Sequence, residues 1–282
     1  MIISSVSGFC GGVERAVAFA ISAAKQCRGK TYIDGALVHN WRVMDSLKSA
    51  GVKLLGEDDL EHATPLDCIV IRAHGISKAR RAQLEYHFKS VIDGTCPHIA
   101  KITQMVERAA NGNRPVLIIG NRSHPEVLAL ASAAAIGKCF AVNSMEEIHS
   151  LPRDLSEILV ISQSTIGEEF FASLAGEIAK IFPGAEIQNT ICGSSIGRQR
   201  AIVGLQKSGA QAIVVVGGRH SNNTATLVAA AKATTLPVFP VETVSDLFHL
   251  PLKKFSAMGV ASGASTDGAS IAEVVSYLAQ LK

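Results

Sequence analysis

The chain has 282 residues, of which 48% are hydrophobic and 5% aromatic, and it carries a formal net charge of +3. This length and composition predict one large or two to three small globular units rather than a disordered chain. The charges are spread without basic runs, which excludes a stripe for nucleic acid and a polybasic segment for a membrane surface.

Short β-branched runs alternate with helical stretches along the whole chain. This alternation is typical of parallel sheets covered by helices. No long linker or low-complexity segment interrupts it. In chain order, the pattern predicts a helix over 13–26, a strand over 67–71, a helix over 99–110, strands over 115–119 and 158–161, helices over 168–181 and 196–207, and a strand over 212–216.

The chain also repeats a pattern three times. Cys10, Cys96 and Cys192 each stand just before a predicted helix, at intervals of about 86 to 96 residues. About 28 or 29 residues after each cysteine, a strand end is followed by a polar loop. A second polar loop follows later in each third. The six loops are Val38-His39-Asn40, Ala73-His74-Gly75, His124-Pro125-Glu126, Ser162-Gln163-Ser164-Thr165, Ser221-Asn222-Asn223 and Ala264-Ser265-Thr266.

These repeats predict a three-lobed α/β protein with parallel-type sheets around a central site. In open α/β sheets, ligands bind beyond the carboxyl ends of the strands, so three lobes facing inward would bring the cysteines and loops together. We expect lobes over 1–94, 95–190 and 191–268, and a C-terminal helix over 269–282 that packs back on the body. The alternative is one continuous doubly wound sheet, in which the three cysteines would be scattered.

Nothing at the start of the chain resembles an export signal. Residues 1–9 lack a cationic segment followed by an apolar core, and no uncharged apolar run reaches the roughly 18 residues of a membrane span. We therefore expect a cytoplasmic protein whose partner is a small molecule. Six widely spaced cysteines in such a chain favour reduced thiols or metal ligands over a disulfide framework.

Three converging thiolates favour an iron-sulfur cluster over structural zinc. Thiolates are soft ligands that suit zinc, copper(I) or iron-sulfur clusters, and a helix start favours the ligating, deprotonated form. Structural zinc usually takes four ligands in close pairs such as C-x-x-C, and none of the six cysteines is so paired. Three ligands on a four-iron cluster would leave one iron open for a substrate. Cys27, Cys68 and Cys139 are interpreted as small hydrophobic residues.

Five segments together resemble the LytB family over essentially the whole chain. They are Gly8-Phe9-Cys10-Gly11-Gly12-Val13-Glu14-Arg15-Ala16, Val38-His39-Asn40, Ala73-His74-Gly75, Thr95-Cys96-Pro97 and His124-Pro125-Glu126-Val127. The resemblance implies a trefoil of three α/β lobes and a [4Fe-4S] cluster on Cys10, Cys96 and Cys192. It implies reductive removal of the hydroxyl of 4-hydroxy-3-methylbut-2-enyl diphosphate, giving isopentenyl and dimethylallyl diphosphate. Electrons would come from an external protein such as ferredoxin or flavodoxin.

The polar loops take their roles from the same resemblance and from the charge of a diphosphate. The chain has neither a G-x-x-x-x-G-K-[ST] loop nor a G-x-G-x-x-G loop, so other donors must meet the anion. Glu126 is the acidic side chain of these loops, and we assign it as proton donor, with Ser164 as a relay. The expected substrate-binding residues are His39, His74, His124, Ser221, Asn222, Asn223 and Ser265. Arg198 and Gln199 also match the family, although solvation or lobe packing explains them equally well.

Several residues depart from the family's usual pattern and leave other functions open. Ser164 stands where a threonine is usual, Asn222 where a serine is usual, and no proline follows Ser265. One altered donor can change which anion a site prefers. A diverged paralogue that reduces another hydroxylated phosphate-type anion is therefore the closest alternative. A cluster-dependent hydro-lyase and a non-enzymatic iron-sulfur sensor or scaffold are two more.

Overall fold

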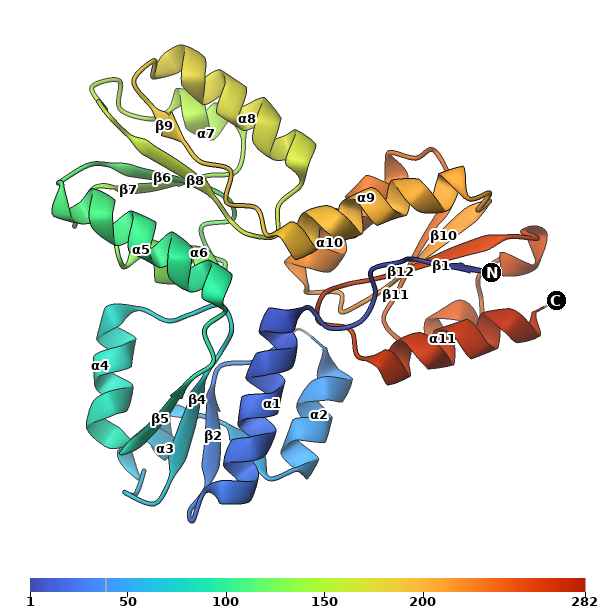
Figure 1. Ribbon diagram of the computed structural model, residues 1–282, viewed down its shortest axis with the longest axis horizontal. Helices are drawn as coiled ribbons and strands as arrows, with labels where there is room; N and C mark the ends of the chain where they lie inside the picture. The colour runs from blue at the N-terminus through green and yellow to red at the C-terminus, as the bar shows by residue number, and fades with distance from the viewer. Residues whose placement is uncertain (39, 282) are drawn as a thin grey trace. The chain divides into compact units, whose positions relative to one another are not determined.

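A computed structural model describes residues 1–38 and 40–281. The described strands form three separate four-stranded sheets, and all their pairings are parallel. The predicted fold class, with three similar α/β lobes, is confirmed, and a single continuous sheet is excluded. Figure 1 shows the three sheets with their helices.

The first lobe contains a sheet of strand order β3-β2-β4-β5. Its central strands, β2 and β4, are buried along their whole length because helices cover both faces of a parallel sheet. Leu84 and Phe88, at the end of α4, pack on Ile69 and Ile71 of β4. The elements are α1 (Gly11–Gln26), β2 (Thr31–Asp34), α2 (Trp41–Ser49), β3 (Val52–Leu54), α3 (Glu57–Glu61), β4 (Cys68–Ile71), α4 (Lys78–His87) and β5 (Ser90–Asp93).

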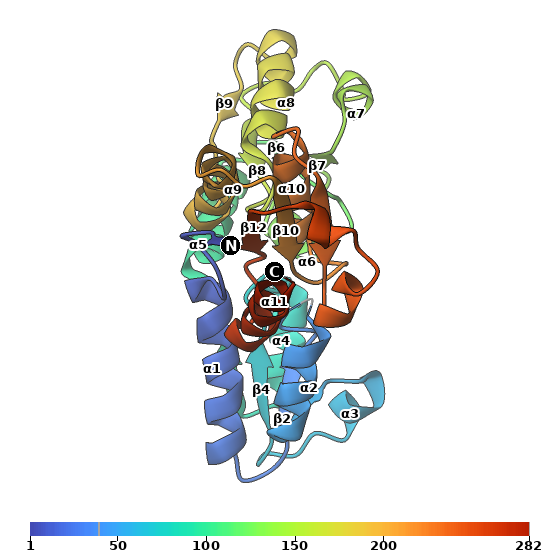
Figure 2. The same cartoon turned by 90° about the vertical axis from the view of Figure 1, so that its right-hand side faces the viewer.

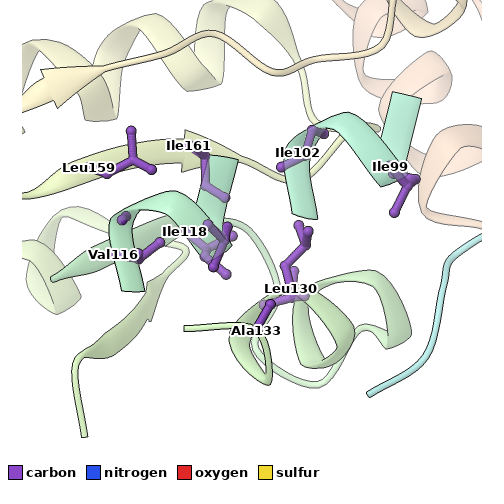
Figure 3. Packing of buried hydrophobic residues seen from close by; sticks show 11 residues of the cluster. Ile99, Ile102, Val116, Ile118, Leu130, Ala133, Leu159 and Ile161 are labelled. Carbon is purple, nitrogen blue, oxygen red and sulfur yellow. The ribbon is translucent and has the colours of Figure 1, made fainter. Parts of the chain in front are cut away.

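The second lobe repeats this strand order as β7-β6-β8-β9. Helices α5 and α6 pack together on one face of the sheet, and α8 covers the other face (Figure 1). Ile99, Ile102 and Leu130 of the helices meet Ile118 and Ile161 of the strands in the core (Figure 3). The elements are α5 (Pro97–Asn111), β6 (Val116–Ile119), α6 (Pro125–Ala131), β7 (Cys139–Val142), α7 (Met145–His149), β8 (Leu159–Ser162), α8 (Glu168–Ile181) and β9 (Glu186–Ile187).

The third lobe has the strand order β1-β12-β10-β11. Strand β1 thus occupies the position that β5 and β9 take in the other two sheets. Both chain ends meet this lobe, β1 beside β12 and α11 against the same sheet (Figure 1, Figure 2). The elements are β1 (Ile2–Ile3), α9 (Gly193–Lys207), β10 (Ala212–Val216), α10 (Asn222–Lys232), β11 (Val238–Val241), the 3-10 turns η1 (Val244–Leu247) and η2 (Leu252–Lys254), β12 (Met258–Ser262) and α11 (Gly268–Gln280).

The chain divides into two compact units, whose bounds differ from those of the three lobes. Unit 1 comprises Met1–Glu14, Val38–Ser46 and Cys192–Lys282, and unit 2 comprises Arg15–Leu37 and Leu47–Ile191. Unit 1 holds the third sheet, and unit 2 holds the other two. The expected lobe over 1–94 therefore differs from the structure at its start, since β1 pairs with β12. The other expected lobe boundaries stay predictions.

The eight predicted elements are found within three residues of their expected ends. The strand over 212–216 and the helix over 168–181 have the predicted bounds. Helices α5 and α9 begin two and three residues early. The early starts arise because a cysteine caps each helix, and because Pro97 has the fixed φ that suits the first helical turn.

Candidate active site

The three predicted cluster ligands occupy the same structural position. The carbonyl oxygens of Cys10, Cys96 and Cys192 accept the first helical hydrogen bonds of α1, α5 and α9, at 2.9, 2.9 and 3.0 Å. The backbone angles of Cys96 and Cys192 are nearly identical, with φ of −59° and −65° and ψ of 133° and 132°. All three thiols are partly exposed. Each cysteine therefore stands at the positive end of a helix dipole.

The cysteines are divided between the two units. Cys10 and Cys192 belong to unit 1, and Cys96 belongs to unit 2. Within neither unit do the described residues bring three His, Cys, Asp or Glu side chains together as a metal site. The convergence of all three thiols stays a prediction.

Arg198 is a buried cation beside the two cysteines of unit 1. Its side chain on α9 is 2% exposed, and it donates to the carbonyl oxygens of Gly8 at 2.7 Å and Ser262 at 3.0 Å. Burial lowers its pKa, and the negative charges of Cys10 and Cys192 oppose that shift. Its buried Nε has no hydrogen-bond partner among residues 1–38 and 40–281. Arg198 is thus a buried positive charge beside the side chains of Cys10 and Cys192, and its burial excludes a solvated helix position.

Glu126 is buried and bonded to Ser164. Its carboxyl group is 1% exposed, and it accepts hydrogen bonds from the Ser164 backbone N–H at 2.6 Å and from Ser164 Oγ at 2.7 Å. Burial raises the pKa of Glu126 to about 7, although both hydrogen bonds from Ser164 oppose that rise. The residue lies in the first turn of α6, but it is not the solvated glutamate that often stands there. A carboxyl group with this pKa can give and take a proton near neutral pH.

Two of the predicted histidines lie next to each other in unit 2. The rings of His74 and His124 are 5.5 Å apart, in an edge-to-face arrangement at 83°. Nδ1 of His124 caps α6 by accepting from the Glu126 N–H at 3.2 Å. The loop that carries His74 turns sharply at Gly75, whose φ of +75° suits glycine. The structure thus gathers His74, His124, Glu126 and Ser164 at the carboxyl ends of β4, β6 and β8.

Unit 1 gathers the polar residues of the third lobe. Ser221 caps α10, and the Asn223 side chain accepts from the Ala264 N–H at 2.9 Å and donates to Ser195 Oγ at 3.3 Å. The Ser265 hydroxyl is buried and has no hydrogen-bond partner within the described part of the chain. These side chains follow the carboxyl ends of β10 and β12, the end at which open α/β sheets generally bind ligands.

The remaining predicted residues lie in different environments or outside the described part of the chain. Asn222 is half-buried as the first residue of α10, while Asn223 beside it is fully buried. His39 lies outside the described residues. Cys68 and Cys139 begin strands β4 and β7, and Cys27 follows the end of α1, as predicted. Burial raises the pKa of the Cys139 thiol to about 11, which makes it a poor ligand or nucleophile.

The sequence did not predict the burial of two residues in this region, Ser195 and Arg198. Ser195 accepts from Asn223 and also from Gln199 Nε2 at 3.3 Å. Arg198 carried a family match, but nothing local in the sequence showed its burial. Their spacing could have indicated both residues. Ser195 and Arg198 stand three and six positions after Cys192, and residues at this spacing lie on one face of a helix.

Comparison with known proteins gives one consistent result. A family model described as LytB protein matches residues 1–279. The 4-hydroxy-3-methylbut-2-enyl diphosphate reductase of Opitutus terrae is 35% identical, with 98% of this chain and 97% of the relative covered. That of Caldanaerobacter subterraneus is 31% identical over 100% of this chain and 97% of its own.

Two solved structures resemble the fold. The E-1-hydroxy-2-methyl-but-2-enyl-4-diphosphate reductase of Plasmodium falciparum superposes with a TM-score of 0.89 at 25% identity, covering 98% of this chain and 86% of that one. A second structure, of an (E)-4-hydroxy-3-methyl-but-2-enyl diphosphate reductase described as the terminal enzyme of the non-mevalonate pathway, gives 0.74 at 29% identity. It covers 99% of each chain. None of the described helices is both long and apolar enough to cross a membrane.

Proposed function

The chain belongs to the LytB family, and we propose that it is a 4-hydroxy-3-methylbut-2-enyl diphosphate reductase. The reaction would break the allylic C–O bond with two electrons and two protons and release the hydroxyl as water. Isopentenyl and dimethylallyl diphosphate would be the products. The buried Glu126–Ser164 pair is the observation that carries the proposal, because it supplies a proton donor in a family whose named reaction needs one.

The donor set fits a [4Fe-4S] cluster held by Cys10, Cys96 and Cys192. Three thiols occupy equivalent helix starts, and Arg198 offsets part of the negative charge that two of them bring. When bound, such a cluster supplies electrons and one iron atom without a protein ligand. The electrons would come from a ferredoxin or flavodoxin in the cytoplasm.

Glu126 would hold the proton that leaves with the hydroxyl. A protonated Glu126 can donate to Ser164 Oγ, and that hydroxyl can then turn its own hydrogen toward the substrate. The serine therefore serves the same relay as the usual threonine would. Because Glu126 is buried, bulk water does not compete for this proton.

The proposed diphosphate contacts are the histidines and the hydroxyl and amide side chains of the polar loops. His74 and His124 would offer imidazole N–H groups, and Ser221, Asn223 and Ser265 would offer hydroxyl and amide donors. His39 and Asn222 complete the set by resemblance. The buried Ser265 hydroxyl supports this assignment, because a hydroxyl left unbonded costs free energy that a ligand oxygen would recover.

The test is anaerobic purification with iron and sulfide analysis, followed by a reduced-dye assay with the expected diphosphate. We expect about four irons per chain, and turnover that requires both the dye and the substrate. Turnover without a reductant would indicate a hydro-lyase instead. An intact cluster that turns over only a different hydroxylated anion would indicate a diverged paralogue.

A further inference from the structure

A hollow of about 290 Å³ lies in unit 2, at the carboxyl ends of β2 and β4. Its polar wall includes Asp34, Arg72 and Arg80, and its apolar wall includes Ile76 and Leu128. Arg72 and Pro125 line the hollow and are close in the sequence to His74 and Glu126, but neither His74 nor Glu126 is among its described lining residues. The hollow therefore has a lining that shares none of the predicted site residues.

The charges in this hollow do not balance. Asp34 is 7% exposed, and a single oxygen of its carboxylate accepts from Arg80 Nε at 3.0 Å and Nη2 at 2.7 Å. That pairing neutralises Arg80 but leaves Arg72 as a second cation on the same wall. Burial lowers the pKa of Arg72, the neighbouring Arg80 lowers it further, and Asp34 opposes both effects.

The Nε atom of Arg72 also lacks a hydrogen-bond partner within the described part of the chain. This atom is fully buried. A buried guanidinium donor without an acceptor is costly, so the chain itself does little to stabilise this cation, and the part of Arg72 that lines the hollow can meet an acceptor from outside the chain. A cation that is not neutralised by a neighbouring carboxylate, in a hollow of this size, suits the binding of a small anion.

Gly35 lies close to the guanidinium of Arg72. A Cβ atom on Gly35 would lie 2.6 Å from Arg72 Nη1, so a larger residue at this position would make the end of the arginine side chain move. The φ of Gly35, +82°, also favours glycine. Ser77 lines the same wall as the N-cap of α4, and its hydroxyl adds a polar group beside the two arginines.

We propose that this hollow binds a small phosphorylated molecule, with the phosphate on Arg72 and a short apolar body on Ile76 and Leu128. A guanidinium presents paired N–H donors that match two phosphate oxygens, which a point charge does not. The phosphate would also neutralise the cation that Asp34 leaves uncompensated. Pro125 and Ala129 extend the apolar wall along α6.

The experiment uses a fluorescent reporter in the hollow. Trp41 is the single tryptophan and lies on α2, and Leu128 is 57% exposed, so Trp41→Phe with Leu128→Trp gives a tryptophan at this wall alone. The anaerobically purified full chain is titrated with inorganic phosphate at constant ionic strength. We expect a saturable signal with a Kd below about 1 mM.

Arg72→Gln in the reporter background should weaken phosphate binding at least about tenfold. The matched control is Arg114→Gln, which removes the same charge from an exposed ion pair with Glu186 in the same unit and should leave binding unchanged. If Arg72→Gln does not fold by circular dichroism, Arg72→Lys keeps the charge but loses the paired donors, and should weaken binding several-fold.

A signal that does not saturate, or an equal loss in Arg72→Gln and Arg114→Gln, would overturn the proposal. Unweakened binding by a folded Arg72→Lys would overturn it in the fallback case. Because the signal is the fluorescence of the Leu128→Trp reporter rather than turnover, failure here is separate from failure of the reductase assignment.

Discussion

At the scale of single residues, the proton-donor assignment rests on the one acidic side chain that the structure buries beside Ser164. Glu126→Gln keeps the shape and loses the transferable proton, so turnover should fall by about a hundredfold or more. Substrate binding and iron content should stay unchanged. The measurement is kcat with a reduced dye.

Glu146→Gln is the matched control for that variant. Glu146 also stands in the first turn of a helix, α7, but it is exposed to solvent. Its replacement should not change turnover. If Glu126→Gln keeps wild-type turnover, Glu126 has no part in proton transfer.

The pKa of Glu126 predicts how stability depends on pH. Burial raises this pKa from 4.5 to about 7, so the folded protein holds the proton more tightly than the unfolded chain. The stability that follows is fully present below pH 4.5 and is lost as pH rises toward 7, at a cost of up to about 3 kcal/mol. Urea unfolding at several pH values should show this fall, and Glu126→Gln should flatten it. An equal slope in both proteins would contradict the raised pKa.

At the scale of elements, α6 connects the core of the second lobe with the candidate active site. Its buried face carries Leu130, which is 0% exposed and packs on the strands of the sheet (Figure 3). Leu130→Ala should lower the free energy of unfolding by about 2 to 5 kcal/mol, because it leaves a cavity. Leu128→Ala, on the exposed face of the same helix, should change it by less than about 0.5 kcal/mol. Similar losses from the two variants in urea unfolding would mean that the core is packed differently.

The helices and central strands could be predicted because their signals are local. The strand over 212–216 is a continuous apolar run, and helix α5 has a regular buried face made by Ile99, Ile102 and Val106. The repeated cysteines then indicated three lobes. Strand β1 could not be predicted, because it has two residues and its partner lies more than 250 positions away.

The candidate site was predicted less completely than the fold. Residue types and spacing pointed to Glu126 and Ser164 separately, but their two hydrogen bonds depend on how α6 meets the loop after β8. The burial of Arg198 and the hollow at Arg72 depend on long-range packing that no local pattern records. Sequence reasoning therefore found donors and acceptors but not their pairing.

At the scale of the whole molecule, the third sheet depends on the first few residues. Deleting residues 1–4 removes the pairing of β1 with β12 and exposes one edge of that strand. We expect hydrogen exchange to speed up in β12, while β4 and β6 of unit 2 stay protected. Unchanged protection in β12 would show that the third sheet holds without β1. Faster exchange in β4 would show that the two units unfold together.

The division of unit 1 into three chain segments also has a consequence for biosynthesis. Unit 2 is complete once residue 191 has left the ribosome, whereas residues 1–14 are made first and wait for β12, which ends at Ser262. Until β12 is made, Cys10 lacks the sheet that positions it, and until residue 192 is made it also lacks Cys192. A ligand set that uses both thiols can form only near the end of translation. Until then the Cys10 thiol is not protected by a bound ligand and can react with oxidants.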